Sequence, residues 1–327
     1  MENRDVTDNV TTMLGTRIYR RVWEQTGILD RLSDFFEEIE QPLLTDAVFD
    51  AVAARSLAPQ DSFTQWRTNN SLFYQTSFIK QAHRLQALIL LGREKSRVFQ
   101  DLRECMVSRT NRAHWMRVHW NLFGLDHCLK GPFNVHHEDY WSMMSFEIAV
   151  IFDRNGFPLA YDLIAPETKS SKVTKQINSI LKGCGYTVTA LPSESEVFWK
   201  DEEESFAGFE AFDYRQSFEL PRERESDRIA WTDEYLQARL MLCHLSLWTD
   251  VALVRILADK GVELSLDSLK TSLNKARLVC IESNKASDSL YAKIDCQGDF
   301  ETIARAFDLS PLPRLGTRDQ VESALKL

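Results

Sequence analysis

The sequence lacks the short motifs that identify most catalytic and metal sites. None of the six cysteines lies within a C-x-x-C spacing, so we expect no structural zinc site. No H-E-x-x-H, Walker A, G-x-G-x-x-G or G-x-S-x-G pattern occurs, which argues against the enzyme classes that depend on these motifs. No apolar segment near residue 1 resembles a secretory signal. Scattered thiols without such a signal indicate a reducing, cytoplasmic location.

Positive charge is scarce overall, because the 327 residues carry a formal net charge of −9. This balance argues against a protein coated on every side for nucleic-acid binding. One zone differs, since between Lys80 and Arg117 nine basic residues stand against three acids. The basic residues are Lys80, Arg84, Arg93, Lys95, Arg97, Arg103, Arg109, Arg112 and Arg117. Two interpretations stay open: a surface that contacts DNA phosphates, with Trp115 and Trp120 among the cations, or a solvated helix face.

The first third of the chain has the pattern of a helical domain. Glycine and proline are nearly absent from residues 13–122, and apolar residues recur there at helical spacing. We therefore expect a helical N-terminal domain over residues 1–122 and a second domain over residues 123–327. The most apolar run, residues 240–257, contains charged side chains, so a buried core helix is favoured over a membrane span.

The second domain opens with the pattern of a sheet. Residues 146–152 form an almost continuous apolar run, which indicates a strand buried on both faces. Turn chemistry at residues 153–156 predicts a hairpin with residues 157–164. A helix is expected over residues 170–181, and a further strand over residues 186–191. This β-β-α-β order predicts a fold of the α+β or α/β class.

The last hundred residues are expected to be mostly helical. Thr232 with the acids that follow it predicts a helix start, and Gly261 predicts its end. The expected elements after that are a helix over 264–275, a strand pair over 277–282 and 289–295, and a closing helix over 299–307.

Three segments stand in a characteristic order along the chain. They are residues 48–62, the Phe123-Gly-Leu-Asp126 segment followed by the hairpin that ends near Tyr161, and the helix that begins at Asp233. In this order and spacing they resemble the DDE-class insertion-sequence transposases, in the branch with a helical N-terminal domain. The resemblance implies a reduced RNase H-like mixed-sheet core, preceded by a helical DNA-binding domain and followed by a helical C-terminal part.

The acids that this resemblance requires are missing from the expected positions. The family's chemistry uses three acids to hold two divalent cations at one end of the sheet. The first acid is expected near Phe133 and the second near Ser193, where the sequence has none. The third would be Glu210 or Glu219, although neither has the expected spacing. We therefore expect a pseudoenzyme without catalytic residues, metal or other cofactor.

The favoured interpretation is a transposase-derived protein that binds double-stranded DNA through the basic zone, without strand cleavage or transfer. A homodimer partner, or another protein of a DNA-handling complex, stays open, and no membrane association is expected. One alternative is a working, divergent transposase that requires Mg²⁺, with Asp126, Asp139 or Asp153 as replacement acids. The other is a protein-interaction scaffold that no longer binds DNA.

Two further groups of residues carry weaker signals. The His136-His-Glu-Asp139 segment has metal-ligand residue types, but adjacent side chains point in different directions, so a polar loop is favoured. Cys105, Cys128, or Cys243 beside His244 would suggest a thiol nucleophile. Buried, unreactive cysteine is the far commoner case and is the one expected.

Overall fold

The computed structural model describes residues 11–70, 79–105, 113–124, 127–128, 134–138, 141–153, 156–165, 167–187, 192–194, 231–281 and 290–327. The helices are α1 (Gly15–Thr26), α2 (Ile28–Glu38), α3 (Leu43–Leu57), α4 (Phe63–Thr68), α6 (Gln81–Arg93), α7 (Lys95–Cys105), α8 (Ser170–Gly183), α10 (Asp233–Asp259), α11 (Leu266–Lys275), α12 (Asp299–Ala306) and α13 (Arg318–Leu325). The strands are β1 (Thr11–Met13), β2 (Ala113–Gly124), β3 (His127–Cys128), β4 (Asn134–Glu138), β5 (Trp141–Asp153), β6 (Pro158–Ile164), β7 (Ser193–Glu194), β8 (Trp231–Thr232), β9 (Arg277–Ile281), β10 (Leu290–Ile294) and β11 (Leu315–Thr317).

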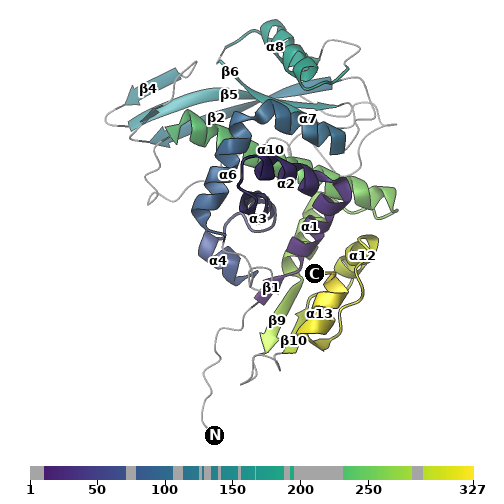
Figure 1. The fold of residues 1–327 in the computed structure, drawn as a ribbon. Coiled ribbons are helices and arrows are strands. Elements are labelled where there is room, and N and C mark those ends of the chain that lie inside the picture. Colours follow the sequence, from purple (N-terminus) through teal and green to yellow (C-terminus); the bar gives the residue numbers. More distant parts are fainter. Residues whose placement is uncertain are drawn as a thin grey trace.

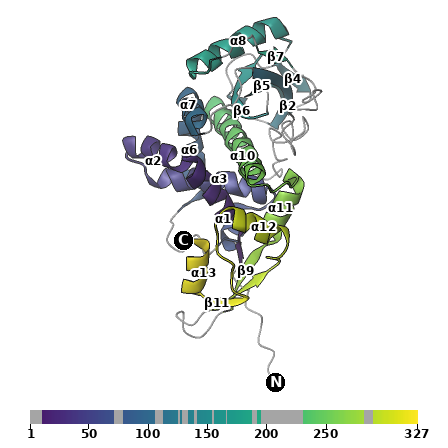
Figure 2. The same ribbon diagram turned by 90° about the vertical axis from the view of Figure 1, so that its right-hand side faces the viewer.

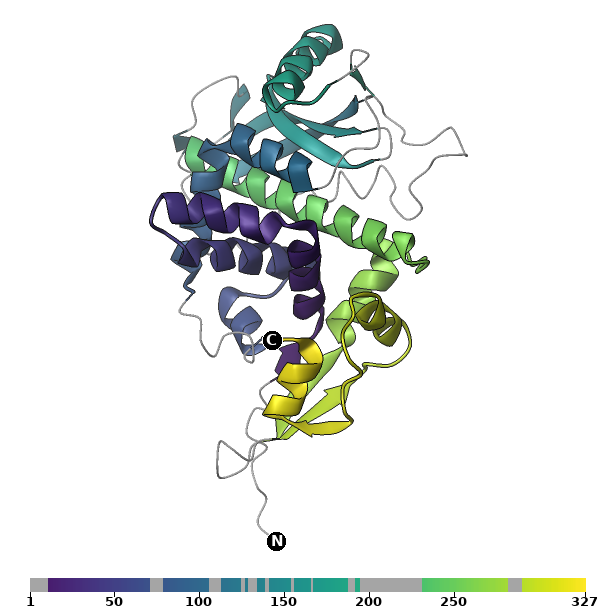
Figure 3. The ribbon, with the colours of Figure 1, turned by 45° about the vertical axis from the view of Figure 1, so that its right-hand side comes forward.

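Three parts follow one another along the long axis of the molecule (Figure 1). A sheet built on β2, β5 and β6 lies at one end, with α8 on its outer face and α7 and α10 on its inner face (Figures 1 and 2). A bundle of α1, α2, α3, α6 and α10 fills the middle. A smaller sheet with α11, α12 and α13 lies at the other end (Figure 3). The fold is thus mixed helix and sheet, compatible with the expected α+β class.

The predicted hairpin is confirmed as the β5–β6 pair. The two strands are antiparallel, and residues 146–152 are buried on both faces of the sheet, as their continuous apolar run requires. At the turn, Gly156 has a φ of +80°, and the Asp153 carboxylate accepts a hydrogen bond of 2.8 Å from the Phe157 amide. The turn residues therefore fix the register that keeps both apolar faces covered.

The order of the large sheet follows from this hairpin. Strand β2 pairs antiparallel with the whole length of β5, and β6 pairs with the other edge of β5. After the crossover helix α8, the short strand β7 pairs with β2 in parallel. The order β6-β5-β2-β7 places β2 between β5 and β7.

Helix α10 confirms the prediction of a buried core helix. The Thr232 hydroxyl accepts a hydrogen bond of 3.1 Å from the Tyr235 amide and caps its N-terminus, and Gly261, with a φ of +74°, follows its C-terminus. By length and composition α10 alone among the helices of the described residues would span a membrane, yet 94% of its apolar window is buried inside the protein. It is a buried core helix, packed against the bundle on one side and β6 on the other.

Two expectations were wrong. Helix was expected as far as residue 122, but residues 113–122 belong to β2, so the expected division at residues 122 and 123 falls inside this strand. Burial alternates along β2, with Met116 and Val118 buried, Arg117 half-buried and His119 exposed, which is a strand pattern. The strand expected over 186–191 was also misplaced: residues 186–187 are not in a strand, residues 188–191 lie outside the described ranges, and β7 begins at residue 193.

The C-terminal elements match their prediction, but their partner was not predicted. Strands β9 and β10 form the expected antiparallel pair, and β1, near the other end of the chain, pairs with β9. Gly15 lies so close to α11 that a Cβ atom there would sit 2.6 Å from the Leu273 carbonyl oxygen. Arg17 donates hydrogen bonds of 2.7 Å to the carbonyl oxygens of Leu325 and Lys326. The two ends of the chain therefore share one unit.

Candidate nucleic-acid interface and the Arg117 cluster

The predicted basic zone is spread over α6, α7 and β2. Lys80 precedes α6 and is exposed, and Arg109 and Arg112 lie outside the described residues. The other members are distributed as follows: Arg84 and Arg93 on α6, Lys95, Arg97 and Arg103 on α7, and Arg117 on β2. Each of these six contacts an acid or a carbonyl oxygen of the protein itself.

Arg84 belongs to the interior of the bundle. Its guanidinium pairs with the buried Asp50 carboxylate, which also accepts a hydrogen bond of 2.7 Å from Trp66 Nε1. Burial raises the pKa of Asp50, against the opposing effect of Arg84, and burial lowers the pKa of Arg84. Because leaving either charge alone in the interior is costly, Arg84 is committed to Asp50 and does not face a ligand.

Three cations of the zone connect α6 and α7 to neighbouring elements. Arg97 donates two hydrogen bonds, of 2.6 and 2.8 Å, to the Glu38 carboxylate on α2. These bonds lower the pKa of Glu38 and raise that of Arg97. Lys95 lies 2.7 Å from Asp162 on β6, and Arg93 pairs with Glu234 on α10. Arg93 and Arg97 are exposed, so a phosphate would reach them only by displacing these carboxylates.

Arg103 holds the segment after α8. Its Nη1 donates a hydrogen bond of 2.5 Å to the Gly185 carbonyl oxygen, and its guanidinium lies 5.8 Å from the centre of the Tyr186 ring. Gly185 has a φ of +79°, and a Cβ atom there would lie 3.2 Å from this guanidinium. Because glycine has no Cβ atom, it adopts this backbone conformation without strain and leaves room for Arg103.

Arg117 lies at the centre of a second arrangement, which we call the Arg117 cluster: Arg117, His119, Glu147 and Glu194. The Arg117 guanidinium pairs with Glu147 on β5 and lies 3.2 Å from Glu194 on β7. It also donates a hydrogen bond of 3.1 Å to the Thr168 carbonyl oxygen. His119 Nδ1 lies 3.3 Å from the other oxygen of Glu147. One cation thus joins three consecutive strands of the sheet.

The electrostatics of the cluster favour a charged arginine. Burial opposes the charge of Arg117, but hydrogen bonds with Glu147 and Glu194 outweigh it and raise its pKa. The planar guanidinium presents several N–H groups in fixed directions, so it can bind both carboxylates and the carbonyl at once. The cluster therefore has the charge and geometry of a structural clamp.

The structure describes only some of the positions considered for the catalytic acids. Phe133, Glu210, Glu219, Asp126 and Asp139 lie outside the described residues. Asp153 is buried, and its carboxylate accepts a hydrogen bond from the Phe157 amide in the hairpin turn. At the second expected position Pro192 is buried and Ser193 belongs to β7. Across the described ranges, no group of three or more His, Cys, Asp or Glu residues has the geometry of a metal site.

The other sequence signals fall in part on β4 and α10. His136, His137 and Glu138 lie in β4, where a loop was expected, and Asp139 is outside the described ranges. Cys243 and His244 are both buried in α10.

Their electrostatics do not favour a nucleophile. Burial raises the pKa of the Cys243 thiol and lowers that of His244 to about 3. Burial also raises the pKa of Cys105 to about 12. These thiols therefore stay protonated near neutral pH, as the expectation of unreactive cysteine required.

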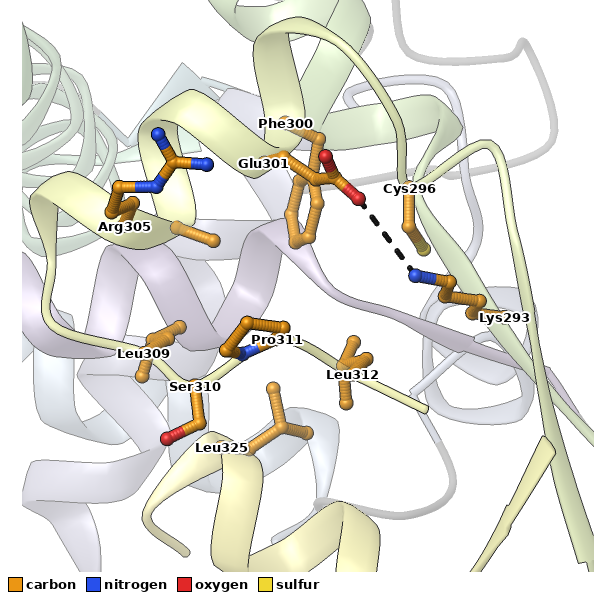
Figure 4. A pocket seen from close by; sticks show the side chains of 11 residues that line it. Lys293, Cys296, Phe300, Glu301, Arg305, Leu309, Ser310, Pro311, Leu312 and Leu325 are labelled. Atoms are coloured by element: carbon orange, nitrogen blue, oxygen red, sulfur yellow. Dashed lines mark ion pairs between the residues drawn. The ribbon is translucent and has the colours of Figure 1, made fainter. Parts of the chain in front are cut away.

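A cavity of about 220 Å³ lies in the C-terminal unit (Figure 4). Phe300, Leu312 and Leu325 form apolar walls, and at one side Lys293 Nζ lies 3.8 Å from Glu301 Oε1. Burial raises the pKa of Cys296 beside them to about 11. The volume is below the roughly 300 Å³ at which small-molecule sites begin, and of the two cations that line it, Lys293 and Arg305, Lys293 already faces a carboxylate. It does not form a candidate active site.

Sequence reasoning missed the pairing of Glu147 and Glu194 with Arg117. Glu147 is the one charge inside an apolar strand buried on both faces, and a buried carboxylate requires a cation. That single residue was the available signal. Comparison with protein-family models, with curated proteins and with solved structures gives no match.

Proposed function

We propose that this chain is a transposase-derived protein that binds duplex DNA and lacks the metal-dependent cleavage of the DDE family. The order of the sheet supports an RNase H-like core. The resemblance expects the first acid on a strand before the hairpin and the second on a strand after the crossover helix. Strand β2 precedes the hairpin, β7 follows the crossover helix, and the two are parallel neighbours, although Phe133, where the first acid was expected, lies beyond the end of β2.

The observation that carries the loss of cleavage is the contact of Arg117 with both Glu147 and Glu194. A two-metal site needs carboxylates that are free to bind hard cations. Here the Arg117 guanidinium on β2 brings the positive charge to one carboxylate on each neighbouring strand, Glu147 on β5 and Glu194 on β7, and it does so without an open coordination position. The arginine therefore supplies the positive charge that a divalent ion would otherwise supply. This supports a core that keeps its fold without a bound metal.

A nicking assay on supercoiled plasmid with Mg²⁺ or Mn²⁺ tests the absence of cleavage. We expect no conversion to nicked or linear DNA, and no change in melting temperature on addition of Mn²⁺. Cation-dependent nicking that disappears when a single aspartate, such as Asp126, Asp139 or Asp153, is replaced would establish the active-transposase alternative instead.

DNA binding is tested by fluorescence anisotropy with short labelled duplexes over a range of salt concentrations. If about six phosphates are neutralised, the logarithm of the affinity falls with the logarithm of the salt concentration at a slope of roughly −5. Duplexes of unrelated sequence should bind alike, since phosphate contacts carry no sequence information. A flat salt response would remove the DNA proposal.

One observation favours a second candidate, a protein-interaction scaffold without DNA binding. The described cations of the basic zone, Lys80 apart, already contact acids or carbonyl groups within the chain. A defined protein partner that co-purifies free of nucleic acid, together with no DNA binding in the anisotropy assay, would select this candidate. Light scattering of the purified chain would show whether that partner is a second copy.

We also propose a cytoplasmic location. Cys105, Cys184, Cys243, Cys280 and Cys296 are free thiols, which supports a reducing compartment. Labelling of the cysteines in protein extracted under acid quench tests this: all should react after unfolding, without prior reduction.

A further inference from the structure

Helix α8 carries an exposed row of cations outside the predicted basic zone. Its lysines, with the one that immediately precedes it, form what we call the lysine face: Lys169, Lys172, Lys175 and Lys182. All four are exposed, and none forms an ion pair with any described part of the chain. Among residues 167–187 of this chain of net charge −9, the one acid is Glu167, which precedes the helix.

The spacing puts Lys172, Lys175 and Lys182 along one side of the helix, and Lys169 stands at its N-terminal end. At about 100° per residue, Lys175 and Lys182 stand two turns apart on the side opposite the buried residues, and Lys172 lies one turn before Lys175. The row from Lys169 to Lys182 extends over about 20 Å. Ser171 and Ser179 are exposed between the lysines and add hydroxyl donors. A row of cations and hydroxyls without acids fits the regular phosphates of a nucleic-acid backbone.

The apolar side of α8 is already occupied, which decides between two kinds of polyanion. Val173, Ile177 and Leu181 are completely buried, and α8 packs on β5 and β6. A helix that binds a lipid surface needs a free apolar face to enter the headgroup region. Because α8 has none, a nucleic acid fits the lysine face better than an anionic membrane does.

We infer that the lysine face of α8 binds the phosphate backbone of duplex DNA. This inference rests on the proposed function and assigns to it a surface that the basic zone does not include. The described cations of the basic zone, Lys80 apart, must first leave carboxylates or a carbonyl group, whereas those of the lysine face have no ion-pair partner among the described residues. Figure 2 shows α8 at the outer end of the molecule, far from α13 and β11, so a long duplex has access to it.

The test compares two variants of the full chain that lose the same charge. In the first, Lys172→Gln, Lys175→Gln and Lys182→Gln neutralise the lysine face. In the matched control, Lys275→Gln, Arg314→Gln and Lys326→Gln remove three exposed cations from the C-terminal unit at the opposite end. All six positions are exposed, so both variants should keep the melting temperature and circular dichroism of the parent.

We expect the lysine-face variant to bind a labelled duplex at least about tenfold more weakly, with a salt slope shallower by roughly 3. The control should stay within about threefold of the parent, since its charges act only through the general field. Equal binding by the two variants, while the parent still binds, overturns the lysine-face assignment and leaves the proposed function standing. A parent that does not bind DNA overturns both.

Two further arms identify the polyanion. Single-stranded or duplex RNA bound more tightly than DNA, with the same dependence on the three lysines, would overturn the assignment to DNA. Co-sedimentation with vesicles of phosphatidylserine and phosphatidylcholine that depends on these lysines, without DNA binding, would do the same in favour of a membrane.

Discussion

The Tyr19 hydroxyl on α1 donates a hydrogen bond of 2.6 Å to the Asp250 carboxylate on α10, across 231 positions of sequence. Lys270 on α11 lies 2.6 Å from the other oxygen of the same carboxylate. Burial raises the pKa of Tyr19 well above its ordinary value, and the Asp250 charge acts in the same direction. Asp250 thus joins the bundle, the core helix and the C-terminal unit at one buried point.

Replacement of Tyr19 by Phe should lower the free energy of unfolding by about 1–3 kcal/mol, because a buried carboxylate loses one of its two strong partners. Urea unfolding measures the change. A double-mutant cycle with Asp250→Asn separates the hydrogen bond from the packing of the ring. A coupling energy near zero would contradict this account of the pair.

The variant Arg117→Met should cost about 2–3 kcal/mol of unfolding free energy. This is less than a fully buried pair would lose, because Arg117 is partly exposed to solvent. It leaves the Glu147 carboxylate, buried in the sheet, with only His119 beside it. Adding Glu147→Gln should recover part of the loss, since the carboxylate that still lacks its cation, Glu194, is more exposed to solvent than Glu147. A double variant less stable than Arg117→Met would contradict the clamp.

His244 should make the protein sensitive to acid. Its folded pKa of about 3 lies below the unfolded value of about 6.5, so between these pH values the unfolded chain binds the proton and the folded chain does not. Stability should therefore fall as the pH falls, by about 1.4 kcal/mol per pH unit from this residue. Asp50 acts in the opposite direction, because its folded pKa is raised, chiefly by burial.

The comparison that isolates His244 is between the parent and His244→Phe. The His244 ring packs edge-on against Phe99, with Tyr161 beside it, so an aromatic replacement keeps most of the packing contact. Unfolding free energies from pH 7 downwards should decline more steeply in the parent. Parallel pH profiles would show that the histidine is protonated in the folded state.

Replacement of Gly15 by Ala should destabilise the protein by about 1–3 kcal/mol, because the new methyl group would meet the backbone of Leu273, which cannot rotate away. Gly183→Ala is the matched control. A Cβ there meets nothing within 4 Å, so the alanine should be neutral or stabilising by up to about 1 kcal/mol. Melting temperatures of the two variants check the contrast.

Charge reversal at Arg93, Arg97 and Arg103 to Glu should weaken duplex binding by tenfold or more for every sequence tested, because phosphate contacts are independent of sequence. The exposed ion pairs lost at Arg93 and Arg97 contribute at most about 1 kcal/mol each, so the fold should survive. Weakening on some sequences and not others would indicate contacts to bases.

Local patterns predicted the elements that depend on neighbouring residues. The hairpin β5–β6 follows from an apolar run and a glycine turn, and α10 follows from the Thr232 cap and Gly261. Strand β2 was mistaken for helix because it continues the glycine-poor, basic composition of α7, and its alternation of buried and exposed side chains is short. Composition over a long window outweighed the period-two pattern that decides a strand.

The site was harder to predict because its partners come together only in the folded sheet. The register of β2 and β5 puts Glu147 opposite His119 and diagonal to Arg117, and Glu194 reaches Arg117 through the parallel pairing of β7. No spacing along the chain encodes either contact. The count of cations between Lys80 and Arg117 was correct, but it could not show that their carboxylate partners lie on α2, β6 and α10.

Strand β1 pairs with β9, which would otherwise be the edge strand of the smaller sheet and would present unpaired amide and carbonyl groups to solvent. An uncovered margin of that kind recruits strands from other molecules and leads to aggregation. A recombinant form that starts after Met13, or a fusion that pulls this strand away, would therefore be poorly soluble even with the rest of the core in place. Affinity tags belong beyond Leu327.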